Sequence, residues 1–90
     1  MNLEEYRQKI DAADDALIRA FRERMEISSG IAAYKKEHGL PILDRSREQK
    51  KLDSVAQQAG ETFAPYAVRL YELLFELSRN YQAHCSEEVE

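Results

Sequence analysis

The sequence is poor in the residues that interrupt helices or cross-link chains. It has two prolines, three glycines, one cysteine and no tryptophan among its 90 residues. So few helix breakers, together with an apolar content of 43%, favour an ordered all-α chain over a disordered one. The single cysteine, Cys85, has no second cysteine to pair with, which excludes an internal disulfide and a cysteine-ligated zinc site.

The sequence also lacks long apolar runs and an excess of basic residues. No run reaches the roughly 18 apolar residues of a membrane span, and the first residues do not form a basic, apolar leader. The formal net charge of -4 argues against general affinity for nucleic acids. We therefore expect a cytoplasmic protein, with a single domain over residues 1–90, that binds neither membranes nor nucleic acids.

Groups that carry out covalent or metal-dependent chemistry are missing as well. There is no glycine-rich phosphate loop, and no Ser/His/Asp or Cys/His arrangement is evident. The two histidines, His38 and His84, fall at predicted helix ends, where solvated roles are commoner than metal ligation. We expect no metal and no cofactor, so any catalysis would rely on positioning and electrostatics.

What the first part of the chain does have is a row of apolar residues in alternating steps of three and four. The row comprises Leu3, Tyr6, Ile10, Ala13, Leu17, Ala20, Ile27, Ile31 and Tyr34. This spacing is typical of a helix face that packs against partner helices. With Asn2 and Glu5 as a capping box and Gly39 as the stop signal, it predicts a long helix over 3–37.

Two shorter helices are predicted in the second half. Asp44 is a good N-cap for a helix over 45–59, which Gly60 ends. Pro65 opens a third helix, over 63–84, and the acidic residues 86–90 are expected to form a frayed tail. The predicted order is therefore long, short and medium helix.

The long helix needs more neighbours than its own chain offers. Thirty-five residues of helix span about 50 Å, whereas a compact chain of this size has a radius of gyration near 12 Å. A second apolar row, Ile18, Phe21, Met25 and Ala32, demands packing on another side too. A homodimer in which two long helices lie against each other would supply these neighbours.

Polar residues interrupt the predicted inward faces of all three helices. The long helix contributes Arg24, inside its apolar row, and Lys35 about three turns later; the second helix contributes Asp44, Arg47 and Glu48, and the third Ser78 and Gln82. Taken singly, each has an ordinary explanation: Arg24 could pair with Asp44 or Glu48, Ser78 could bond its own helix, and Gln82 could be half exposed. Together they indicate a site for a compact dianion that carries a hydroxyl.

Five short segments resemble the all-helical chorismate mutases in their order and spacing. They are Tyr6-Arg7-Gln8-Lys9-Ile10-Asp11, Arg22-Glu23-Arg24, Ala33-Tyr34-Lys35, Pro41-Ile42-Leu43-Asp44-Arg45-Ser46-Arg47-Glu48 and Ser78-Arg79-Asn80-Tyr81-Gln82. The resemblance covers nearly the whole chain. It implies an intertwined homodimer of three-helix subunits, a monofunctional enzyme, and conversion of chorismate to prephenate by a Claisen rearrangement in the biosynthesis of phenylalanine and tyrosine.

The resemblance also implies a role for each candidate residue. Arg7 from the partner chain and Arg24 would hold the two substrate carboxylates, while Lys35 and Gln82 would donate hydrogen bonds to the ether oxygen. Glu48, with help from the backbone near Asp44, would accept a hydrogen bond from the ring hydroxyl. Arg47 would brace the site, and Ser78 would contact the ring carboxylate. Arg24, Lys35, Glu48 and Gln82 would be the catalytic set.

Two other functions stay open at this point. An isochorismate-pyruvate lyase resembles this family in fold, but the resemblance implies that such lyases lack an acid at the position of Glu48. A catalytically silent helical dimer that regulates an aromatic-pathway enzyme should have lost some of the cationic residues. This chain has kept them.

Overall fold

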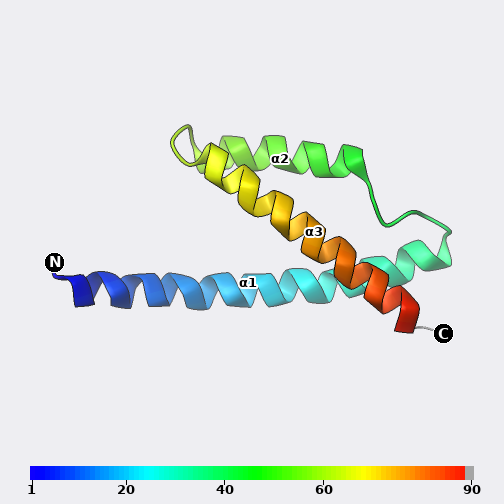
Figure 1. The fold of residues 1–90 in the computed structure, drawn as a ribbon, viewed down its shortest axis with the longest axis horizontal. Coiled ribbons are helices and arrows are strands. Elements are labelled where there is room, and N and C mark those ends of the chain that lie inside the picture. The colour runs from blue at the N-terminus through cyan, green and yellow to red at the C-terminus, as the bar shows by residue number, and fades with distance from the viewer. Residues whose placement is uncertain (89–90) are drawn as a thin grey trace.

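The computed structural model describes residues 1–88, and within that range the chain forms three helices and no strand (Figure 1). Helix α1 spans Leu3–Glu37, α2 spans Arg45–Ala59 and α3 spans Ala64–Glu88. In Figure 1, α3 crosses obliquely over the C-terminal part of α1, and α2 runs beside α3 on the side away from α1. The predicted all-α architecture, with a long, a short and a medium helix, is confirmed.

The ends of the first two helices lie where local capping signals predict them. The side-chain oxygen of Asn2 accepts a hydrogen bond from the backbone N–H of Glu5 at 2.8 Å. In the same way, Asp44 accepts from the backbone N–H of Arg47 at 3.0 Å and caps α2. Gly60 follows α2 with φ at +82°, a left-handed conformation that glycine adopts without strain.

Helix α3 differs from its prediction at both ends. It begins at Ala64, one residue late, and continues to Glu88, where the sequence predicts fraying from residue 86 onward. The Lys36 ammonium donates to the backbone carbonyl of Ser86 at 3.1 Å, so the last described turns are held against α1. This contact joins residues 50 positions apart, which a local signal could not predict. Residues 89–90 of the predicted tail lie outside the described residues.

The subunit is elongated, and one helix holds it together. Its radius of gyration is 16.3 Å and its extents are 54 × 27 × 14 Å, well beyond the value near 12 Å of a compact chain. Helix α3 packs against both α1 and α2, whereas α1 and α2 do not pack against each other within residues 1–88. In Figure 1 the N-terminal part of α1 projects away from the other two helices.

This arrangement leaves the predicted apolar row of α1 uncovered within one chain. Leu3, Tyr6, Ile10 and Leu17 are each more than half exposed. The buried apolar residues among those described are small or medium-sized, Ala32 and Val55. A single subunit therefore does not bury the row that the periodicity assigns to a helix interface. None of the described helices has a stretch apolar enough, and free enough of charge, to cross a bilayer.

Candidate active site

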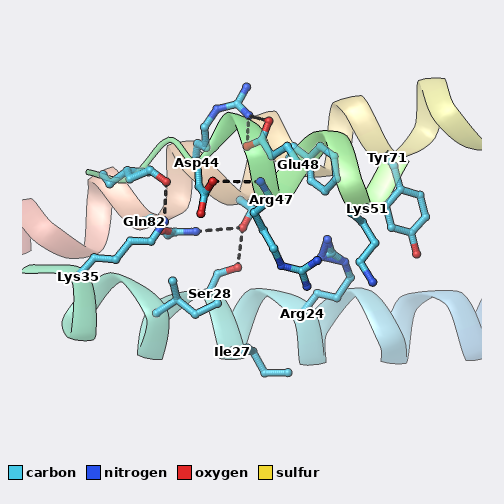
Figure 2. Close-up of a pocket in the computed structure, with 15 residues that line it drawn as sticks. Arg24, Ile27, Ser28, Lys35, Asp44, Arg47, Glu48, Lys51, Tyr71 and Gln82 are labelled. Atoms are coloured by element: carbon cyan, nitrogen blue, oxygen red, sulfur yellow. Dashed lines mark hydrogen bonds and ion pairs between the residues drawn. The ribbon is translucent and has the colours of Figure 1, made fainter. Parts of the chain in front are cut away.

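A cavity of about 700 Å³ lies where the three helices converge (Figure 2). Seven of the eight predicted site residues line it: Arg24, Lys35, Asp44, Arg47, Glu48, Ser78 and Gln82. They come from α1, α2 and α3 and from the N-cap of α2. The structure thus brings together polar residues that are up to 58 positions apart in the sequence, as their places on the predicted inward faces imply.

Arg7 is the predicted site residue that does not reach this cavity in its own chain. It is exposed on the projecting part of α1, and it is absent from the residues that line the cavity. Seventeen residues of helix separate it from Arg24, which corresponds to about 25 Å along the helix axis. The site of one chain therefore contains seven of the eight predicted groups.

Cationic side chains from two helices, α1 and α2, line one part of the cavity. Figure 2 shows Arg24 extending from α1 toward α2, and Arg47 and Lys51 extending from α2 toward α1. The guanidinium of Arg24 lies 5.6 Å from the centre of the Tyr71 ring, within range of a cation–π interaction. Neither Asp44 nor Glu48 forms an ion pair with Arg24 among the described residues, so the ordinary explanation for this arginine is wrong.

Lys35 occupies the other end of the cavity and also fixes the connection between α1 and α2. Its ammonium donates to the backbone carbonyl of Ile42 at 2.7 Å. An ammonium has three donors, and this bond uses one of them. Lys35 is therefore anchored at a defined position and can still donate to a ligand in the cavity.

The two predicted carboxylates differ in their surroundings. Asp44 lines the cavity as predicted, although it is exposed, and its side chain also caps α2. Oδ1 of Asp44 is the atom that accepts this capping hydrogen bond. Glu48 is half-buried, and both of its oxygens accept from Nη1 of Arg79, at 2.7 and 2.5 Å. Of the two acidic residues that line the cavity, Glu48 is therefore the more buried and the one held by an ion pair.

A buried polar cluster lies where α3 crosses α1. The hydroxyls of Ser28 and Ser78 are 2.6 Å apart, and Ser28 is 4% exposed. Gln82 is 6% exposed; its Nε2 lies 3.4 Å from the Ser78 hydroxyl, and its Oε1 has no hydrogen-bond partner. A buried amide oxygen without a partner costs about 1–3 kcal/mol. Ser78 thus bonds across helices and Gln82 is buried, which contradicts the ordinary explanations for both.

Several lining residues carry no role in the predicted site. They are Ile27, Ser28, Ile31, Ile42, Lys51, Tyr71, Phe75 and Arg79. Helical spacing could have indicated several of them; Ser28, for example, follows Arg24 by four residues and Lys51 follows Arg47 by four. Arg79 gave no such signal, since its partner Glu48 is 31 positions away on another helix.

The fold and the cavity together define an all-helical protein with a polar cavity in which cationic side chains outnumber acidic ones. Comparison with known families gives the class: residues 6–83 match the family described as chorismate mutase type II. The match covers most of the chain, and the protein belongs to this family. It is accordingly an isomerase, a chorismate mutase that converts chorismate to prephenate.

Individual relatives agree with the family. A chorismate mutase of Methanocaldococcus jannaschii is 27% identical over 90 residues, which cover 98% of this chain and 91% of the relative. A 4-amino-4-deoxychorismate mutase of Streptomyces venezuelae is 30% identical over 74 residues, 80% of this chain and 72% of the relative. A monofunctional chorismate mutase of Enterobacter agglomerans is 48% identical over 48 residues, 50% of this chain and 26% of the relative. No solved structure gives a significant match. None of these similarities favours the lyase or the silent dimer.

The crossing of α3 over α1 yields a test by a double-mutant cycle. We expect Ser28→Ala and Ser78→Ala each to lower the free energy of unfolding by about 1 kcal/mol, because each removes the hydrogen bond between the two hydroxyls. The double variant should lose about 1 kcal/mol less than the sum of the single effects. Urea unfolding followed by circular dichroism measures all three variants. Ser29→Ala is the control, since its hydroxyl bonds only the Glu26 carbonyl of the same helix. Additive effects of the two substitutions would contradict the coupling.

Proposed function

We propose that the cavity between α1, α2 and α3 is the active site of this chorismate mutase, and that two chains form a homodimer in which Arg7 of each completes the site of the other. The observation that carries the proposal is the convergence of seven predicted residues in one cavity while Arg7 stays on the projecting part of α1. The enzyme would act in aromatic amino acid biosynthesis, in the cytoplasm as the sequence predicts.

The exposed row of α1 supports the dimer. A chain that leaves Leu3, Tyr6, Ile10 and Leu17 more than half exposed has a continuous apolar face on its longest helix. Apolar faces of this extent mark interaction surfaces. A second copy of the same helix, lying antiparallel on a two-fold axis, would cover the row and carry its own Arg7 back toward the cavity.

The rearrangement needs restraint of the substrate and no covalent catalysis. One carbon–oxygen bond breaks as one carbon–carbon bond forms within a single molecule, so no proton transfer or intermediate is required. Arg24 and the partner subunit's Arg7 would hold the two carboxylates and keep the molecule in its compact, chair-like conformer. Holding the reacting atoms close in this way lowers the entropic part of the activation free energy.

Two donors would stabilise the charge that develops on the ether oxygen. Lys35 has donors to spare beyond its bond to the Ile42 carbonyl. The Gln82 amide is held only by a long contact to Ser78, so its Nε2 can turn to a ligand. Donors directed at an atom whose negative charge grows in the transition state lower the free energy of the transition state more than that of the ground state, which raises the rate.

The rest of the cavity would bind the ring. Glu48 would accept a hydrogen bond from the ring hydroxyl with help from the backbone near Asp44, Ser78 would contact the ring carboxylate, and Arg47 would brace that wall. The similarity to a 4-amino-4-deoxychorismate mutase makes the amino analogue, in which an amine replaces this hydroxyl, a second candidate substrate. The group facing that position decides between them.

The central test is turnover of chorismate by the purified protein, followed by its ultraviolet absorbance and by identification of the product. We expect prephenate, and we expect Lys35→Ala and Arg24→Ala each to lower kcat/KM by at least about 10²- to 10³-fold, the usual cost of losing such a donor. Lys50→Ala is the matched control, because Lys50 is exposed on α2 and does not line the cavity. A folded protein without turnover, or full activity in the Lys35 and Arg24 variants, would overturn the proposal.

The role of Gln82 yields a pH test. An amide can donate a hydrogen bond without taking up a proton, so we expect wild-type turnover to change little between about pH 5 and 8. A carboxylate must be protonated before it can donate, so Gln82→Glu should lose activity as the pH rises and recover it toward acid. Initial rates across this range measure both profiles. Identical profiles for the two proteins would refute the role of Gln82 as a donor.

A mixing experiment tests the shared site. Arg7→Ala and Arg24→Ala should each be nearly inactive alone. After joint unfolding and refolding, half of the dimers are mixed, and one of the two sites in each mixed dimer has both arginines. We therefore expect recovery of about a quarter of wild-type activity. If Arg7 serves the site of its own chain, or the protein is a monomer, the mixture stays inactive.

A further inference from the structure

The ion pair between Glu48 and Arg79 is a feature of the cavity that the predicted roles leave unused. Nη1 of Arg79, on α3, donates to both oxygens of Glu48, on α2, at 2.7 and 2.5 Å. The two side chains are 32% and 25% exposed respectively, so the pair is partly shielded from solvent. Among the described residues it is the only ion pair, and it joins α2 to α3, two helices that pack against each other beside the cavity.

The pair changes what the Glu48 carboxylate offers to a ligand. A free carboxylate attracts any cation, whereas one that already has a guanidinium against both oxygens is neutralised as a unit. Lys51, one helical turn after Glu48, lines the same wall and adds a further positive charge. Asp44, one turn before Glu48, is the other carboxylate of the cavity, and its Oδ1 accepts from the backbone N–H of Arg47. The cations Arg47, Lys51 and Arg79 outnumber these two carboxylates, so the surroundings of Glu48 are positive in balance although the residue itself is acidic.

This local charge separates a hydroxyl from an amine at the same ring position. A hydroxyl is neutral and can donate to a remaining lone pair of the carboxylate. An aliphatic amine is protonated near neutral pH, so it would bring a full positive charge close to Arg79 and Lys51. A cation there would have to displace Arg79 from Glu48 or be repelled by it.

We propose that Arg79 is a positioning residue that sets substrate specificity: by binding Glu48 it makes this wall of the cavity accept a ring hydroxyl and reject a ring ammonium. This inference rests on the proposed function, in which Glu48 faces the ring hydroxyl. Arg79 would act by holding Glu48 and would not itself contact the substrate.

The test compares kcat/KM for chorismate and for 4-amino-4-deoxychorismate in the wild type, Arg79→Gln and Arg79→Lys. The wild type should prefer chorismate. In Arg79→Gln the ratio of kcat/KM for the amino compound to kcat/KM for chorismate should rise by roughly tenfold or more, because the negative charge of Glu48 is then uncompensated. Arg79→Lys keeps the charge and should keep most of the preference for chorismate.

The matched control is Arg69→Gln, which removes the same charge from an exposed position of α3 that does not line the cavity. It should leave the ratio unchanged, and thermal unfolding checks that every variant is folded. If the role of Arg79 is merely structural, its substitution lowers kcat/KM for both compounds by the same factor, and that outcome would overturn the proposal. An equal change of the ratio in Arg69→Gln would also overturn it.

Failure of the proposed function would look different. If the wild type rearranges neither compound, the mutase proposal fails, and both compounds then remain intact for equilibrium binding by calorimetry. The measurement is then the ratio of the affinity for the amino compound to the affinity for chorismate. A higher ratio in Arg79→Gln than in the wild type would still support the selective role. Equal relative affinities in the two proteins would exclude it.

Discussion

The crossing of α3 over α1 is the contact on which the site depends. Ser28 and Ala32, one turn apart on α1, are nearly fully buried there, and Ser78 and Gln82, one turn apart on α3, face them. Small side chains let the two helix backbones approach closely, and the bond between the serine hydroxyls then fixes their register. A larger apolar crossing would exclude the amide of Gln82 from the cavity. The same contact therefore supports the fold and places a polar group in the cavity.

Helix α1 divides into two parts with different tasks. Its C-terminal part carries Arg24 and Lys35 into the cavity and takes the contact with α3. Its N-terminal part has no covering helix in the same chain and exposes its apolar row. A chain with so few fully buried apolar residues has a small core to offset its conformational entropy. Association through the exposed row would therefore contribute to stability as well as to the completeness of the site.

How far the sequence could predict this structure depends on the range of each interaction. The starts of α1 and α2 follow from Asn2 and Asp44, because capping acts over three residues. The inward faces could be extended by helical spacing, which assigned seven polar residues to them, and all seven line one cavity. Contacts between distant helices had no such signal. The extension of α3 depends on Lys36, and the partner of Glu48 depends on how α3 lies against α2.

The charges in the cavity explain why its polar residues are held as they are. Five cationic and two acidic side chains line it, and Arg79 with Glu48 removes one of each from the balance. The remaining cations repel one another, and the buried Oε1 of Gln82 has no partner, so both features cost folding free energy. Such costs persist at functional sites when the rest of the fold offsets them. In the proposed active site a dianionic substrate would be complementary to this balance, because its two carboxylates would face a surplus of positive charge while its hydroxyl would meet a carboxylate already paired with Arg79. The same positive field that would bind the carboxylates would also favour negative charge on the ether oxygen, which would link recognition of the substrate to the rate of its rearrangement.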